Sequence, residues 1–189
     1  MKYLKIISSI IILILLVHPI KSQDSISIHK LFYKKQQQSL SLLSSWSVGN
    51  LIFSPLAAND LFSPNNTNEY FYQMNFNWNL LNVGIAGLGH IIVNKDSKKP
   101  WDMQTLHLKK KKAEKSIIIN IGLDLAYMAT GFLLKNNAQK SNAESSMNKG
   151  YGNSLILQGG YLLLYDAIFL MKLKKIIIKT KAKKVDVIQ

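Results

Sequence analysis

Four mostly apolar stretches follow one another along the chain, separated by polar segments. Three of them, residues 72–94, 116–134 and 154–173, approach the length of about 20 residues that a helix needs to cross a bilayer. The fourth, residues 39–58, is less apolar, because it contains several Ser residues and is interrupted by Gly49 and Asn50. We therefore predict an all-α integral membrane protein, a bundle of four helices in which three are confident spans.

The chain begins with the pattern of an export signal. Lys2 and Lys5 precede an apolar run over residues 6–17, and Pro19 and the small residue Ser22 follow it. This pattern predicts a signal peptide over residues 1–22, with an uncleaved signal anchor as the alternative. A single helical membrane domain is then expected over residues 23–175, followed by a basic tail over residues 176–189.

Lysines alternate between the segments that join the predicted spans. Residues 95–115 contain eight Lys, residues 136–152 contain two, and the tail from residue 172 contains seven. Short cytoplasmic loops carry an excess of Lys and Arg, so the first and third of these segments are predicted to be cytoplasmic. An exported residue 23 then implies that residues 39–58 do not cross, and the preferred interpretation is three spans plus an amphipathic, interfacial helix. In the alternative, residues 39–58 cross and the basic segments face outward.

Each confident span carries its polar residues on one face. A helix turns by about 100° per residue, so positions three or four apart share a face. The spacing predicts three inward-facing stripes, formed by Asn75, Asn79, Asn82, Ala86 and His90; by Asn120, Asp124, Tyr127 and Gly131; and by Gln158, Leu162, Tyr165 and Asp166.

The depths of these residues predict two polar layers. Counting about 1.5 Å per residue from the nearest Lys-rich segment places His90, Asp124, Asp166 and Asn120 at similar depths. An ionised Asp at the centre of a membrane helix costs about 2.5–3.5 kcal/mol, so Asp124 is predicted to be buried against His90 and Asp166. A second layer, farther from those segments, comprises Asn82, Gln158 and Asn79.

Three roles are open for these polar residues. They act as interhelical contacts; they form a proton or ion path; or they take part in catalysis. Small residues that would provide close approach for such contacts are Gly84, Gly87, Gly89, Gly159 and Gly160. The first role is favoured, because polar groups in membrane helices often act only as interhelical contacts. Catalysis is the least favoured, and the sequence contains no phosphate loop, dinucleotide fingerprint, HExxH or GxSxG motif. One histidine and two carboxylates do not make a usual metal site, so neither metal nor cofactor is expected.

The charge of the chain is +14, and every basic residue is Lys. Nucleic-acid recognition usually depends on the planar guanidinium of Arg, so a nucleic-acid partner is not expected. Next to membrane spans, clustered Lys residues attract anionic lipid head groups. The residues predicted to do so are Lys109, Lys110, Lys111, Lys112, Lys174 and Lys175.

Four features together resemble an uncharacterised family of small exported bacterial membrane proteins. They are the export signal, the segment "LLSSWSVGNLIFSP", the segment "YFYQMNFNWNLLN" and two spans that each carry an Asp. The resemblance implies no activity. We expect a non-enzymatic membrane interaction or assembly protein in the bacterial cytoplasmic membrane, with a membrane protein or a second copy as partner. The alternative is a small transporter or ion- or proton-coupled channel that uses the Asp and His layer.

Overall fold

The computed structural model describes residues 27–138 and 143–178, and their regular structure is entirely helical. The predicted all-α class is confirmed. The helices are α2 (Ile28–Ala57), α3 (Thr67–Ser97), α4 (Met103–Asn137) and α5 (Ala143–Lys174). The predicted signal peptide and most of the basic tail lie outside the described residues.

Polar side chains cap the first turns of three helices. Ser27 accepts a hydrogen bond from the backbone amide of Lys30 at the start of α2, and Asn66 accepts from two amides at the start of α3. The Asp102 carboxylate accepts from the Thr105 amide of α4 at 2.6 Å. These bonds satisfy amides that have no partner inside the helix, and so they determine where each helix begins.

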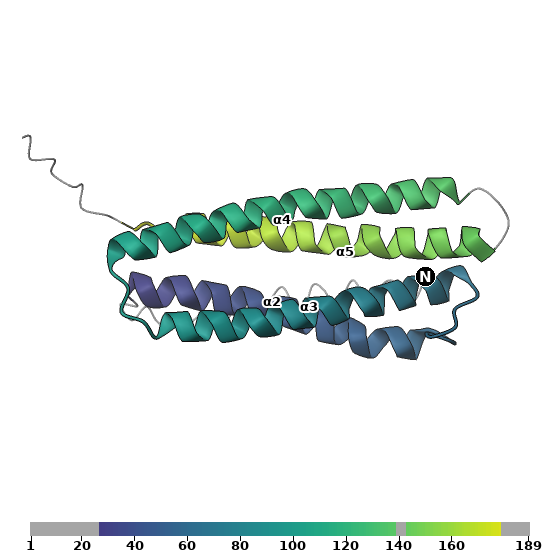
Figure 1. Ribbon diagram of the computed structural model, residues 1–189, viewed down its shortest axis with the longest axis horizontal. Coiled ribbons are helices and arrows are strands. Elements are labelled where there is room, and N and C mark those ends of the chain that lie inside the picture. Colours follow the sequence, from purple (N-terminus) through teal and green to yellow (C-terminus); the bar gives the residue numbers. More distant parts are fainter. Residues whose placement is uncertain (1–26, 139–142, 179–189) are drawn as a thin grey trace, which may run out of the picture.

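The helices form two antiparallel hairpins that lie side by side (Figure 1). α2 packs along α3, α4 packs along α5, and the two hairpins meet mainly through α3 and α5. Successive helices run in opposite directions, so the starts of α2 and α4 and the ends of α3 and α5 lie together. We call this the Lys-rich end; its lysines are Lys30, Lys34, Lys35, Lys95, Lys98, Lys99, Lys109–Lys112, Lys115, Lys172, Lys174 and Lys175.

All four helices are long and apolar enough to cross a membrane. This differs from the preferred interpretation of the sequence, in which residues 39–58 lie at the interface. α2 is 30 residues long and contacts α3 from Tyr33, which bonds to Asp96, to Asn50, which bonds to Asn75. The sequence pattern underestimates how well this helix could span a membrane, because its Ser residues lower its hydropathy. Ser39, Ser47 and Ser54 are nevertheless buried against the neighbouring helices.

The predicted basic loop between the second and third helices is mostly helical. Only residues 98–102 join α3 to α4, so Lys109–Lys112 lie on the second and third turns of α4. Lys110 forms an ion pair with Glu114, one turn further on, at 2.7 Å. The lysines therefore project from a rigid helix rather than from a loop.

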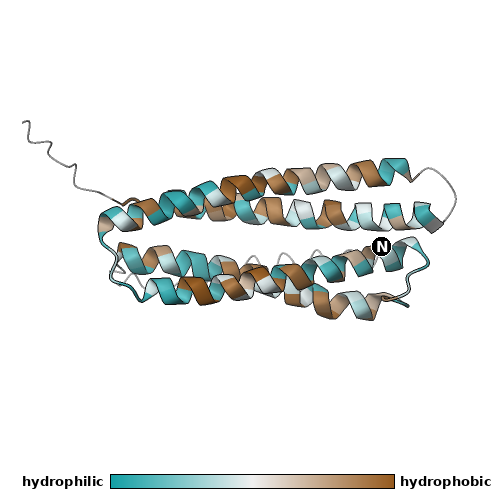
Figure 2. Cartoon of the chain, in the orientation of Figure 1, coloured by the Kyte–Doolittle hydropathy of each residue, from teal (hydrophilic) through white to brown (hydrophobic). Residues whose placement is uncertain are grey.

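Over most of its length the bundle is polar inside and apolar outside. Asn79 and Gln158 have exposed fractions of 0%, whereas Leu81 and Ile92 on the outer face of α3 have 66% and 64%. Figure 2 shows apolar residues concentrated along the middle of the helices and hydrophilic ones toward their ends. A water-soluble bundle has the opposite arrangement.

The Lys-rich end has the ordinary arrangement instead. A compact apolar cluster built around Phe32, Leu106, Leu173 and Ile117 fills the bundle there. Around it the surface carries the lysines. The polarity of the interior thus changes along the bundle axis, from apolar beneath the lysines to polar in the middle.

Candidate functional site in the polar interior

The polar stripe of α3 faces the interior of the bundle. Asn75, Asn79, Asn82 and Ala86 are all buried, and Val93 continues the buried face toward the Lys-rich end. On α4 the buried positions include Asp124 and Gly131, and on α5 Gln158 and Asp166. The helical spacing therefore identifies the inward faces of these three helices.

Asn75 is the centre of a hydrogen-bond network that joins three helices. Its amide nitrogen donates to Asn50 Oδ1 at 2.6 Å and to Ser54 Oγ at 3.1 Å, both on α2. Its carbonyl oxygen accepts from Gln158 Nε2 on α5. Gln158 Oε1 in turn accepts from the Trp46 indole nitrogen at 3.1 Å. The side-chain nitrogen and oxygen of Asn75 and the side-chain oxygen of Gln158 thus all form hydrogen bonds within the bundle.

An aromatic stack continues this network along α2 and α5. The rings of Trp46 and Tyr161 are stacked with centroids 3.8 Å apart, and Tyr165 follows Tyr161 at 6.2 Å. The Tyr165 hydroxyl accepts a hydrogen bond from Ser39 at 2.7 Å. These large rings bridge α2 and α5, which have few other contacts with each other.

The predicted layer of carboxylates forms partly between α4 and α5. The Asp166 carboxyl lies near the Asn120 side chain and interacts electrostatically with the Asp124 carboxyl. Asp124 and Asp166 are buried, while Asn120 lies at an exposed position of α4. The structure thus brings these three residues together.

His90 points toward α2 instead. Its Nδ1 lies 2.6 Å from Gln37 Oε1, and its Nε2 lies 3.4 Å from Ser44 Oγ. Since the amide oxygen of Gln37 can only accept, Nδ1 carries the proton. Both described partners of His90 are on α2, so its ring lies against that helix, and the predicted contact with Asp124 stays a prediction.

The second predicted layer is divided. Gln158 and Asn79 both bond to Asn75. The Gln158 amide nitrogen donates to the Asn75 side-chain oxygen, and the Asn79 amide nitrogen donates to the Asn75 backbone oxygen at 2.7 Å. The Asn82 amide nitrogen is buried and has no hydrogen-bond partner among the described residues. The side-chain oxygen of Asn79 is also buried and has no hydrogen-bond partner among the described residues.

One oxygen of Asp124 is also buried without a partner in the described part of the chain. Trp78 of α3 contacts Tyr127 of α4 edge-on, with ring centroids 4.7 Å apart. Asn82 follows Trp78 by one turn and Asp124 precedes Tyr127 by nearly one turn on the antiparallel helix. Asn82 and Asp124 therefore lie at one level of the bundle, on the Lys-rich side of this aromatic contact.

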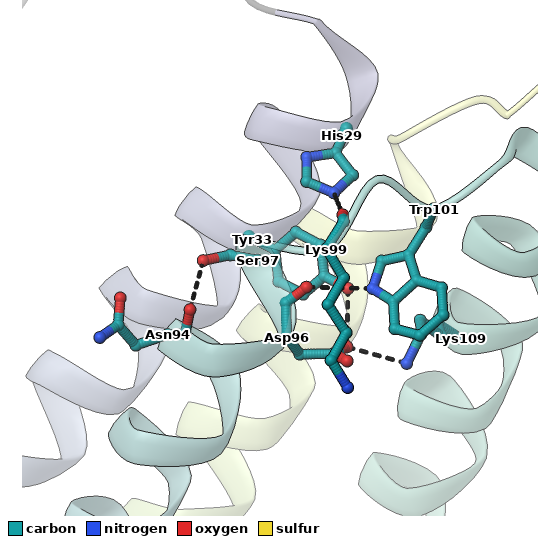
Figure 3. Close-up of polar contacts among 8 residues, drawn as sticks. All are labelled: His29, Tyr33, Asn94, Asp96, Ser97, Lys99, Trp101 and Lys109. Atoms are coloured by element: carbon teal, nitrogen blue, oxygen red, sulfur yellow. Dashed lines mark hydrogen bonds and ion pairs between the residues drawn. The ribbon is translucent and has the colours of Figure 1, made fainter.

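A third polar cluster fixes the turn between α3 and α4 at the Lys-rich end (Figure 3). The Asp96 carboxylate accepts from the Tyr33 hydroxyl at 2.7 Å and pairs with Lys109 at 2.8 Å. The Trp101 indole donates to the Asp96 backbone oxygen at 3.0 Å, and the Lys109 ammonium lies 4.2 Å from the centroid of the Trp101 ring. His29 bonds to the backbone oxygen of Lys99 at 3.1 Å.

Sequence reasoning did not find several of these partners. Trp46, Ser54 and Gln37 lie on α2, whose pattern predicts an interfacial helix rather than a wall of the interior. Tyr33 and Asp96 are 63 positions apart, and no motif connects them. Within residues 27–138 and 143–178, no three His, Asp or Glu side chains are placed to hold a metal ion.

A family model matches residues 42–167, from the middle of α2 to the second half of α5. The chain belongs to the DUF6992 family, a family of unknown function. The matched segment contains the whole Asn75 network and the Asp124, Asp166 and Asn120 cluster, and the expectation of an uncharacterised family is confirmed. No curated protein and no solved structure matches the chain.

Proposed function

We propose that this DUF6992 protein is a four-span protein of the bacterial cytoplasmic membrane with a non-enzymatic role in membrane interaction or assembly. The observation that carries the proposal is the inverted polarity of the bundle. Asn75, Asn79 and Gln158 are buried, while large aliphatic side chains on α3, α4 and α5 face outward. In water this arrangement exposes apolar surface and desolvates amides, whereas in a bilayer the same faces meet lipid.

Helix lengths support this proposal. Helices of 30 to 35 residues are about 45–52 Å long, compared with about 30 Å for the hydrocarbon core. Each helix therefore extends beyond the core at one or both ends. The apolar cluster around Phe32, Leu106 and Leu173, surrounded by lysines, has the arrangement expected of a segment that projects into water.

The orientation follows from the lysines. Short cytoplasmic segments carry an excess of Lys, so we place the Lys-rich end in the cytoplasm and residues 58–66 outside. Because α2 runs the length of the bundle, residue 27 is then cytoplasmic. The predicted export signal, whether cleaved or kept as an anchor, would put residue 27 outside and reverse the bundle.

The internal hydrogen bonds support a structural role for the polar residues. Asn75 joins α2, α3 and α5, and polar groups of this kind stabilise helix association in membranes by about 0.6 kcal/mol each on average. Gly131, Gly152 and Gly159 allow the backbones of α4 and α5 to approach closely. The interior thus holds the helices together and leaves the outer faces for partners in the bilayer, such as a second copy.

Cysteine accessibility in intact cells tests this proposal, because the chain contains no Cys. The exposed positions Asn65 and Asn137 at one end, and Lys98 and Lys175 at the other, would each be changed to Cys and treated with an impermeant maleimide. We expect labelling at 65 and 137 alone. Labelling at 98 and 175 alone would keep four spans and reverse the orientation. Equal labelling at all four positions would show that the helices do not cross.

A second candidate function is proton or ion coupling, and one observation favours it. The buried Asp124 carboxyl has an oxygen without a described partner, it lies level with the unpaired amide of Asn82, and it interacts with Asp166. Ionisable groups inside a membrane bundle commonly mark proton or ion paths. This function would use the interior as a path, and the polar contacts would then be more than helix packing.

Proton flux into proteoliposomes distinguishes the two functions. Under coupling, wild-type protein conducts protons when a potential is applied, and Asp124→Asn abolishes the flux. Asp60→Asn, in the exposed segment between α2 and α3, is the matched control and should conduct normally. Wild-type flux no greater than that of empty liposomes would leave the structural role as the function.

A further inference from the structure

A groove of about 670 Å³ opens between α2 and α3 at the Lys-rich end. The polar side chains that line it come from both helices and include His29, Lys30, Lys34, Gln37, His90 and Asn94. Neither the Asn75 network nor the Asp124 cluster uses this groove, although it contains His90 of the predicted polar layer.

The groove is positively charged. Lys30 and Lys34 lie one turn apart on α2 with exposed side chains, and none of the described residues that line the groove is acidic. The nearest carboxylate on α3, that of Asp96, is engaged by Tyr33 and Lys109. In Figure 3 its side chain points toward Trp101 and Lys109, whereas Asn94 points to the opposite side. The ion pair therefore directs the Asp96 carboxylate to Lys109 and away from the groove lysines.

Hydrogen bonds orient the two histidines of the groove. The imidazole of His90 donates from Nδ1 to Gln37 at 2.6 Å, and that of His29 donates from Nε2 to the backbone oxygen of Lys99 at 3.1 Å. Both contacts connect α2 to α3 or to the turn that follows it. The lining is thus held in place without a ligand.

The groove lies at the boundary of the outer apolar surface. The run of outward apolar side chains ends at Ile92 on α3, Ile118 on α4 and Met171 on α5, and beyond it only isolated ones, such as Leu108 and Ile177, are exposed among the described residues. The first lysines beyond them are Lys95, Lys115 and Lys172. If the helices cross a bilayer, this level is where lipid phosphates lie, because the hydrocarbon ends where the apolar side chains end.

An apolar ridge runs away from the groove along α3. Its members are spaced by three or four residues and are more than 60% exposed: Leu81, Ile85, Leu88 and Ile92. Ile91, next to this ridge, lines the groove itself. A ligand with an anionic head and a long apolar chain fits both features, since the head meets Lys30 and Lys34 and the chain lies along the ridge.

We propose that this groove is a binding site for the head group of an anionic phospholipid, with the phosphate held by Lys30 and Lys34. The inference rests on the proposed membrane insertion. It deepens that function by assigning one defined site to the lipid contact, which the sequence attributed to lysines of α4 and α5. Ammonium groups bind phosphate as point charges, and the groove places two of them on one helix face.

Native mass spectrometry of the detergent-solubilised full chain tests the site with phosphatidylglycerol as the probe and phosphatidylcholine as the uncharged comparison. We expect the wild type to retain phosphatidylglycerol preferentially. The double variant Lys30→Gln/Lys34→Gln should bind it on the order of tenfold more weakly, since each lysine at an anionic lipid surface contributes several-fold to binding. The matched control Lys135→Gln/Lys149→Gln removes the same charge from exposed positions at the other end of the bundle and should retain the lipid.

Three outcomes would overturn the proposal. Equal loss in both double variants would mean that the lysines attract lipid diffusely. Equal retention of phosphatidylcholine would mean that the charge of the head group is not recognised. Displacement by inorganic phosphate at the same concentration as the lipid would identify a free phosphate site rather than a lipid site. Failure of membrane insertion would appear separately, in the cysteine labelling of wild-type topology.

Discussion

Gly131 of α4 and Gly152 of α5 pack backbone against backbone. A Cβ atom on Gly131 would lie 2.7 Å from the Gly152 carbonyl oxygen, and one on Gly152 would lie 2.6 Å from the Gly131 carbonyl oxygen. Both oxygens belong to the backbone, so neither can move unless its helix moves. This contact, rather than side-chain interdigitation, sets how close the two helices lie at this point.

We therefore expect Gly152→Ala to lower the free energy of unfolding by about 1–3 kcal/mol, because the added methyl group forces the helices apart. Unfolding of the purified protein in detergent, followed by circular dichroism, measures the change. Gly122→Ala is the control on α4, where a Cβ meets nothing within 4 Å. It should stabilise the helix by up to about 1 kcal/mol, because Ala is the better helix former. Equal effects of the two substitutions would contradict the close approach.

The Asn75 network predicts a second stability difference. Asn75→Ala removes the hydrogen bonds to Asn50, Ser54 and Gln158, and the buried Ser54 hydroxyl and Gln158 amide nitrogen lose this partner. We expect a loss of about 2 kcal/mol in the same unfolding measurement. Asn77→Ala makes the same change two residues later, at an exposed position of α3, and should have little effect. If both variants unfold alike, Asn75 does not join the helices.

The hydrogen bond of the Tyr33 hydroxyl predicts a third stability difference. Tyr33→Phe deletes its hydrogen bond to Asp96, and bonds to charged groups contribute about 1.5–3 kcal/mol. We expect the free energy of unfolding to decrease by an amount near the lower limit of this range, because Lys109 still pairs with Asp96. Thermal unfolding measures it. In Tyr72→Phe the lost hydroxyl has no described hydrogen bond, and the melting temperature should not change. A melting temperature unchanged in Tyr33→Phe as well would argue against the cluster.

The cap of α4 predicts a pH dependence. The hydrogen bond from the Thr105 amide holds the pKa of the Asp102 carboxyl below its ordinary value. A carboxyl with a lowered pKa stabilises the fold above its unfolded pKa, and the contribution is lost as the pH falls through the folded pKa. Amide exchange protection at Thr105, corrected for the intrinsic rate, should therefore decrease on acidification through that range.

Asp102→Asn provides the control for this measurement. Asn also caps helices well but does not titrate in this range, so the protection of Thr105 should remain and lose its pH dependence. A pH dependence that persists in Asp102→Asn would assign it to another group.

The sequence alone determined the all-helical class and the inward faces of α3, α4 and α5. In each span the few polar residues recur every three or four positions, and a helix brings such positions onto one face that avoids lipid. The buried positions Asn75, Asn79 and Asn82 on α3 and Asp124 on α4 follow from this periodicity. The family match adds membership and leaves these assignments unchanged.

Only the tertiary structure decided which of these residues meet. Gln158 pairs with Asn75 across 83 positions, and His90 contacts Gln37 across 53, because these contacts depend on which helices are neighbours and on how each is rotated. The depth of a residue can be counted along one helix, but its partner depends on the packing of several. For the same reason the sequence underestimated α2: its Ser residues lower its hydropathy, and only the neighbouring helices show that Ser39, Ser47 and Ser54 are buried.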